Sequence, residues 1–170
     1  MRRRRTARTC LTPRTGITIV FFVNGALFAS WASRIPALSD RVGATSGTLG
    51  LALLAPAVGA IVAMPLVGKL LPGRSSRSFT RLGVIALMAA ILVPPAAHTV
   101  PELAGALFLV GLANSTLDLS MNAQGLTIER RRREPILSSL HAAFSFGGFA
   151  GAGLGAVAAD RKSTRLNSSH

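Results

Sequence analysis

The sequence predicts an all-α membrane protein that crosses the bilayer five times, and three observations predict it. Of the 170 residues, 49% are hydrophobic and only 15% are charged, with a mean hydropathy of +0.47. The apolar residues form long blocks instead of the stripes of a soluble amphipathic helix. The blocks approach the roughly 20 residues that a helix needs to cross a bilayer core of about 30 Å. The five predicted helices cover residues 16–33, 47–67, 79–97, 102–123 and 136–159.

The first predicted helix follows a basic segment, residues 1–15, which we expect to stay in the cytoplasm. That segment and the helix together resemble a signal peptide, but four more apolar blocks follow, which favours an uncleaved first helix. Trp31, the only tryptophan, lies near the end of this helix, where amphipathic rings settle at the outer interface. Cys10, the only cysteine, has no partner for an internal disulfide.

The second and third predicted helices contain prolines, which disturb soluble helices but are common in membrane-spanning ones. Small residues recur at every fourth position in three of the five helices. Four residues turn a helix by about 400°, so each set lies on one face, where a neighbouring helix can approach closely. A sequence rich in Ala and Gly also contains such spacings by chance, most easily in the second helix. The sets are Gly25, Ala29 and Ser33; Ala55, Gly59 and Ala63; and Gly147, Gly151 and Gly155.

The net charge of +13 is distributed in a way that indicates a lipid bilayer and excludes a nucleic acid as the partner. Fourteen Lys and Arg lie before the first helix or in the second and fourth gaps between helices. The first gap holds only Arg34 and Arg41, and the third gap holds none. This alternation is the positive-inside pattern of an integral protein whose N-terminus is cytoplasmic, in a bacterial-type inner membrane. A DNA-binding face would instead collect its basic residues on one surface of a folded domain.

A polar ribbon runs along the fourth helix, because Asn114, Asp118 and Asn122 are spaced by four and share one side. An ionised Asp at mid-membrane costs about 2.5–3.5 kcal/mol, which is tolerated where it faces a protein interior or a wet cavity. We therefore expect Asp118 to carry a proton or bind a polar substrate, with both asparagines lining the same path. The alternative is that all three only link helices, through hydrogen bonds worth about 1 kcal/mol or less.

Two further residues are candidates for this path. His141 shares a face of the fifth helix with Ser138 and Ser145 and is expected in its cytoplasmic half. Asn24 lies midway along the first helix, where a structural hydrogen bond is an equal alternative to a pathway role. One His and one Asp, without Cys or a Glu-x-x-His pair, predict no metal site, and a G-x-S-x-G elbow is missing. We therefore expect no enzymatic activity and no cofactor.

The last eleven residues, 160–170, read DRKSTRLNSSH and differ abruptly in composition from the helix before them. One coding of this string is a common sequencing-library adapter read in frame. We therefore expect an artefactual tail at the end of a truncated chain. A genuine polar tail is the alternative.

Four stretches together resemble the major facilitator superfamily, most closely its fucose-permease-like branch and related bacterial inner-membrane permeases. The most specific parts are LDLSMNAQG in the fourth helix and SSLHAAFSFGG in the fifth. The wider stretches are FFVNGALFASWASRIPAL, GTLGLALLAPAVGAIVAMPLVGKLL, GLANSTLDLSMNAQGLTIERR and SSLHAAFSFGGFAGAGLGA.

The resemblance implies a twelve-helix secondary transporter that moves a small polar solute, with a sugar as one candidate, by alternating access between two six-helix halves. This chain would supply helices 1–5 of the N-terminal half. In the sugar-symporter relatives a carboxylate of helix 4 couples protons to substrate, and Asp118 lies in the matching stretch. The implied partners are the solute, protons and the bilayer; no protein partner follows from the sequence.

The chain departs from the family pattern in two places. In the turn between helices 2 and 3, Pro72 stands where the superfamily has an Asp, and Gly73 where it has an Arg. A gating salt bridge through that Asp therefore cannot form. The acidic residue late in helix 1 of fucose-type relatives also has no counterpart. The alternative to transport is a non-catalytic five-helix scaffold or assembly protein, which requires a native chain that ends soon after Ala159.

Overall fold

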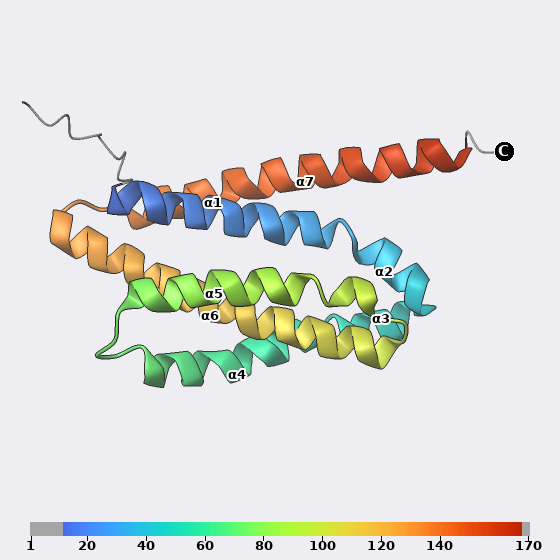
Figure 1. Ribbon diagram of the computed structural model, residues 1–170, viewed down its shortest axis with the longest axis horizontal. Helices are drawn as coiled ribbons and strands as arrows, with labels where there is room; N and C mark the ends of the chain where they lie inside the picture. The colour runs from blue at the N-terminus through green and yellow to red at the C-terminus, as the bar shows by residue number, and fades with distance from the viewer. Residues whose placement is uncertain (1–11, 168–170) are drawn as a thin grey trace, which may run out of the picture.

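The structure is a computed structural model that describes residues 12–167, with side chains described for residues 12–157 (Figure 1). Most of the basic N-terminal segment, with Cys10, and the last three residues of the expected tail lie outside the described residues. The elements are α1 (Pro13–Ala32), α2 (Ile35–Val42), α3 (Ser46–Ala52), α4 (Ala55–Leu70), α5 (Ser76–Ile91), the 3-10 helix η1 (Pro94–Ala96), α6 (Val100–Arg132) and α7 (Leu137–Asn167).

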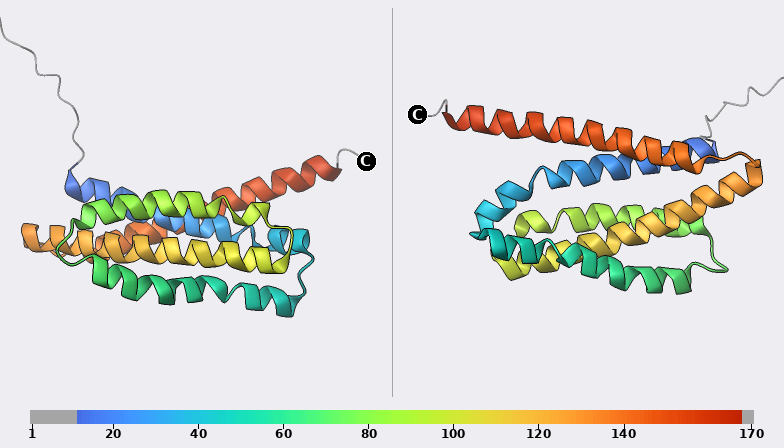
Figure 2. Two further views of the ribbon diagram at one scale, coloured as in Figure 1. Left: turned by 60° about the horizontal axis from the view of Figure 1, so that its bottom comes forward. Right: turned by 180° about the vertical axis from the view of Figure 1, so that it is seen from behind.

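The prediction of an all-α membrane protein with five spans is confirmed. Five helical segments are long and apolar enough to cross a bilayer, and residues 12–167 contain no strand. Successive spans run in opposite directions, with α1 and α7 side by side and α6 lying between α4 and α5 (Figures 1 and 2). The five candidate spans are Pro13–Ala32, Ser46–Leu70, Ser76–Ala96, Val100–Arg132 and Leu137–Val157.

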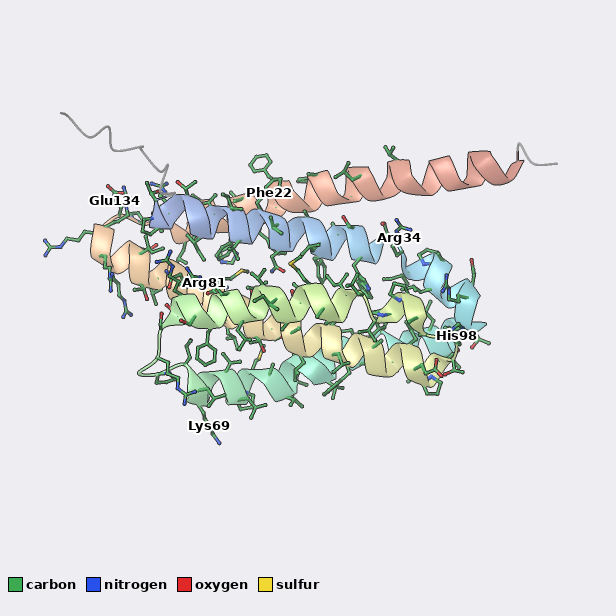
Figure 3. The ribbon with its side chains drawn as sticks, viewed as in Figure 1. Phe22, Arg34, Lys69, Arg81, His98 and Glu134 are labelled. Atoms are coloured by element: carbon green, nitrogen blue, oxygen red, sulfur yellow. The ribbon has the colours of Figure 1, made fainter. Side chains whose placement is uncertain are left out.

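The positive charges of the described loops lie mostly at one end of the bundle. This basic end is where α1 and α5 begin and where α4 and α6 end. It carries Lys69, Arg81 and Glu134, whereas Arg34 and His98 lie at the opposite end (Figure 3). The separation matches the alternation along the sequence between gaps rich in Lys and Arg and gaps with two or none.

Pro56 divides the second predicted helix into two pieces, α3 and α4. A proline ring has no N–H to donate and collides with the carbonyl four residues earlier, here that of Ala52. The helix accordingly stops at Ala52, turns through Leu53 and Leu54, and restarts with Pro56 in the first turn of α4. Pro65 lies inside α4 without ending it. A single continuous helix over residues 47–67 is therefore not observed.

Other boundaries also differ from the predicted ranges. The short helix α2 fills the first gap and ends at Gly43, whose φ of 62° is the left-handed conformation that glycine adopts readily. The α6 helix continues nine residues beyond the predicted end at residue 123, to Arg132. The backbone of α7 continues to Asn167, through the first eight residues of the expected tail. Apolar runs mark the part of a helix that lies in lipid, not the whole helix.

Glycines make the two tightest helix contacts, which confirms the small-residue faces predicted for the first, second and fifth helices. A β-carbon at Gly147 would overlap the carbonyl oxygen of Phe22 in α1, and one at Gly151 would overlap that of Ala26. The α4–α6 contact is made in the same way, with Gly59 against the carbonyl of Phe108. Ser30 adds a hydrogen bond across the α1–α7 interface, donating from Oγ to the carbonyl of Gly151 at 3.2 Å.

Glu129 ties the end of α6 to the beginning of α7. Its carboxylate accepts hydrogen bonds from the backbone N–H groups of Ile136 at 2.8 Å and Leu137 at 3.0 Å. The first N–H groups of a helix have no partner within the helix, so this side chain satisfies two of them. Arg133 turns the chain between the two helices with φ of 56°.

Replacing Gly151 with Ala should destabilise the protein, because the added methyl group would push α1 and α7 apart, at a cost of about 1–3 kcal/mol. Gly153→Ala is the matched control, since nothing lies within 4 Å of a β-carbon built at that residue of the same helix. It should leave stability unchanged or raise it by up to about 1 kcal/mol through helix propensity. Thermal unfolding of the two variants in detergent checks this, and equal unfolding temperatures would contradict the close contact.

Candidate functional site

The polar ribbon predicted for the fourth helix lies on α6, where two of its members are joined. The side-chain amide of Asn122 donates to the backbone carbonyl of Asp118 at 2.9 Å and to its carboxylate Oδ1 at 3.2 Å. Asn114 lies one turn nearer the start of α6 and is half-buried. The spacing thus brings Asp118 and Asn122 into contact, while Asn114 belongs to a separate feature described below.

Asp118 is exposed within the described chain, so the five helices do not enclose it. His141 of α7 lies in the same region, since Leu117 and Leu140, the residues that precede Asp118 and His141, belong to one buried apolar cluster. His141 lies in the second turn of α7, toward the basic end, as the sequence predicts. Asp118, Asn122 and His141 therefore form a polar patch, open on the side that α6 and α7 share.

An aromatic ring of α1 supports His141 from below this patch. The Phe21 and His141 rings meet edge to face, with centroids 5.4 Å apart and planes at 80°. Phe21 is fully buried, whereas the His141 side chain is exposed. An aromatic pair in this geometry restrains the imidazole without consuming either of its nitrogens. Among the described residues, the hydrogen bond that His141 accepts is at its backbone carbonyl, from Ser145, so both ring nitrogens can take a proton or a ligand.

Asn24 differs from the ribbon because it is buried, with 2% of its surface exposed, and its Oδ1 has no hydrogen-bond partner among the described residues. The structure joins it by no hydrogen bond to Asp118 or His141. A buried amide oxygen without a hydrogen-bond partner lowers folding stability by about 1–3 kcal/mol, so a role other than stability is expected for Asn24.

A cavity of about 220 Å³ lies between α1, α4, α5 and α6, and Asn114 lines it. Its wall is mostly apolar, with the aromatic rings of Phe28 and Trp31 on one side and the hydroxyl of Ser115 near Asn114 on the other. The indole Nε1 of Trp31 is buried without a hydrogen-bond partner among the described residues. The cavity therefore combines aromatic surface with the amide of Asn114.

Trp31 lies in the last turn of α1, and its half-buried ring packs against the apolar cluster of Leu38, Ala97, Leu103 and Leu107. The sequence analysis missed Phe28, Trp31 and Ser115 as lining residues. Phe28 and Trp31 are three apart and so share a helix face, which is the one signal that could have paired them.

The site residues suit hydrogen bonding and proton transfer more than metal binding. No group of three or more His, Cys, Asp and Glu that could hold a metal ion occurs among the described residues. An exposed carboxylate beside an imidazole can exchange a proton with water or with a bound group.

Replacing Asn24 with Leu should raise the free energy of unfolding by about 1 kcal/mol or more, because it removes an unsatisfied buried amide at similar volume. Thr80→Val is the control, since the equally buried Thr80 hydroxyl already donates to the Ser76 carbonyl at 2.9 Å. That variant should give no such gain. Chemical or thermal unfolding in detergent measures both, and destabilisation by Asn24→Leu would show that the amide is satisfied.

Three curated relatives match most of this chain. It is 33% identical over 151 residues to an uncharacterized transporter of Sinorhizobium fredii, and 31% over 143 residues to an uncharacterized MFS-type transporter of Yersinia pestis. It is also 30% identical over 137 residues to the membrane protein MosC of Rhizobium meliloti. The matches cover 89%, 84% and 81% of this chain but only 40%, 37% and 34% of the relatives.

The chain therefore spans about two fifths or less of the length of the curated relatives it matches. No family model and no solved structure matches it. The relatives agree with the helical architecture in one respect, since all three are named as transporters or as a membrane protein. The Yersinia pestis relative is named as an MFS-type transporter, so over 84% of its length this chain is similar to a protein of that type.

Proposed function

We propose that this chain is the N-terminal part of a secondary active transporter of the major facilitator superfamily. It moves a small polar solute, with a sugar as the first candidate, across the inner membrane by alternating access, and protons are the coupling ion. The fucose-permease-like branch is the proposed subfamily, on the resemblance of LDLSMNAQG and SSLHAAFSFGG. The names of the relatives support the transport role.

The observation that carries the proposal is the patch of Asp118, Asn122 and His141 on apolar spans. A carboxylate within a membrane-spanning helix is costly and is retained where it serves a pathway or a proton relay. The face that bears Asp118 is uncovered by the described helices, as a surface that lines a path between two halves of a transporter has to be.

The cavity beside Asn114 supports a small polar solute with an apolar face. Its volume of about 220 Å³ is below the roughly 300–1,000 Å³ of pockets for drug-sized ligands, so its occupant is small. A sugar ring presents C–H groups to an aromatic face and hydroxyls to amides. Phe28 and Trp31 offer aromatic surface, and Asn114 offers donors and an acceptor.

Asp118 and His141 give the proposed transporter a means of coupling. A proton bound at the carboxylate removes its charge, so the face can enter a drier environment than the ionised form tolerates. Asn122 holds the carboxylate through Oδ1, which leaves Oδ2 for a proton or a substrate hydroxyl. In this scheme His141, with both nitrogens uncommitted, passes protons toward the basic end.

Asp118→Asn in the full-length protein should abolish concentrative uptake while membrane insertion stays intact. An amide cannot carry the proton that drives accumulation, although it can still hydrogen-bond a hydroxyl. The measurement is accumulation of radiolabelled hexoses and pentoses in proteoliposomes with an imposed pH gradient, together with equilibrium exchange without a gradient. If the variant still exchanges solute, Asp118 carries the proton. If exchange is also lost, Asp118 contacts the substrate.

The matched control is Asp40→Asn, which removes the same charge from an exposed position in α2 outside the candidate spans. Its uptake should equal that of the unmodified protein. Unchanged accumulation in Asp118→Asn would refute the proposed role, and a sugar panel without any uptake in the unmodified protein would refute the solute class.

The proposed orientation has the basic end in the cytoplasm, and single cysteines test it. With Cys10 replaced by Ser, Ala37→Cys in α2 should react with a membrane-impermeant maleimide in intact cells. Ser78→Cys, at the opposite end in the first turn of α5, should react only after permeabilisation. Both side chains are exposed, so accessibility to the reagent differs only by the side of the membrane. The reverse labelling pattern would invert the topology.

A further inference from the structure

The basic end of the bundle contains a second and larger hollow, which the proposed transport path does not use. It has a volume of about 780 Å³ and lies between the beginning of α1, the turn and first residues of α5, and the last turns of α6. Six arginines line it: Arg14, Arg74, Arg77, Arg81, Arg131 and Arg132.

Little negative charge opposes these arginines in the described chain. Glu134 makes the ion pairs found there, with Arg132 at 3.3 Å and, more loosely, with Arg14 at 4.0 Å. The other four arginines of the hollow have no ion pair among the described residues. Like charges gathered in one concave surface raise its potential and repel one another, so an anion that enters is stabilised.

A topology signal alone does not require this arrangement. The positive-inside rule needs basic residues on one side of the membrane, in any direction. Lys69, Arg130 and Arg133 meet that need at the same end without lining the hollow. Convergence of six arginines, five from three helices and one from the turn before α5, is the additional fact that points to a ligand.

The wall of the hollow supplies the groups that bind phosphate. Arginine presents a planar fork of donors that matches phosphate oxygens in pairs. The beginning of α5 adds Ser75 and Ser76 to the lining, and no side chain caps that helix end. Ser76 also hydrogen-bonds Gln124 across to α6, which fixes the two walls relative to each other.

The floor of the hollow is apolar. Ile17 and Ile128 are buried there with 4% and 6% of their surfaces exposed, beside Val20. A phosphate ester with a hydrocarbon part fits such a site, since its charged end meets the arginines and its carbon skeleton meets the floor. The cytoplasmic leaflet is anionic, and basic clusters next to membrane helices attract its headgroups.

We propose that this hollow is a binding site for a phosphate-bearing anion, either the headgroup of an anionic phospholipid or a free phosphorylated solute. Arg77 and Arg81 of α5 are its central ligands, with Arg74 and Arg131 beside them. The site is separate from Asp118, so binding here does not rest on the transport proposal.

The test uses the purified full-length protein in a neutral detergent at fixed ionic strength. One arm titrates dioleoyl phosphatidylglycerol against the zwitterionic dioleoyl phosphatidylcholine, followed by native mass spectrometry. The other arm titrates inorganic phosphate and glycerol 3-phosphate, followed by calorimetry. Arg77→Gln/Arg81→Gln removes two charges inside the hollow. Lys69→Gln/Arg130→Gln removes two from the same end outside it and is the matched control.

The pocket variant should weaken binding about tenfold or more, because each lost arginine removes charge-assisted hydrogen bonds, whereas the control should change it less than about twofold. If the pocket variant alone loses affinity for phosphatidylglycerol, the ligand is a lipid headgroup. If it loses affinity only for the soluble phosphates, the ligand is a free phosphorylated solute. Equal weakening by both variants, or no preference for an anion in either arm, would overturn the site. If the double variant does not fold, Arg77→Gln against Lys69→Gln gives the same comparison, with about threefold expected.

Discussion

Close backbone contact at glycines is the constraint on which this bundle depends. Lipid is as apolar as the side chains it surrounds, so burial alone gives membrane helices little reason to associate. The α1–α7 and α4–α6 pairs associate through close backbone contacts. Gly147 and Gly151 of α7 pack against carbonyl groups of α1, and Gly59 of α4 packs against a carbonyl group of α6. Each pair leaves large apolar side chains such as Phe149 and Ile61 pointing outward, where lipid or further protein can cover them.

The bundle places its polar groups in two regions with different chemistry. Asp118, Asn122 and His141 lie on the open side of α6 and α7, where single charges meet an imidazole and an amide. The arginine-lined hollow lies at the basic end, where positive charge accumulates without an equal number of acids in the described chain. The first region suits a group that changes its charge during a cycle, and the second suits a permanent anion.

The sequence predicts the spans well because a bilayer imposes one length and one polarity on every crossing. It also predicts that Gly147 and Gly151 share a face and that Asn122 meets Asp118, since helical spacing decides both, but it does not separate Asn114 from that pair. It does not predict the break before α4, because Pro56 and Pro65 look alike in sequence and only one of them ends a helix. The cavity beside Trp31 and Asn114 also escapes prediction, because it depends on how four helices pack and not on any one of them.

The interruption between α3 and α4 gives the bundle a built-in joint. The two pieces meet at Leu54, whose N–H donates to the Leu51 carbonyl and whose carbonyl accepts from the N–H groups of Ala57 and Val58. Pro56 at the joint touches Gly111 of α6, and both residues line the small cavity. The break in the second span therefore lies at the wall of that cavity, away from the end of the molecule that carries the arginines.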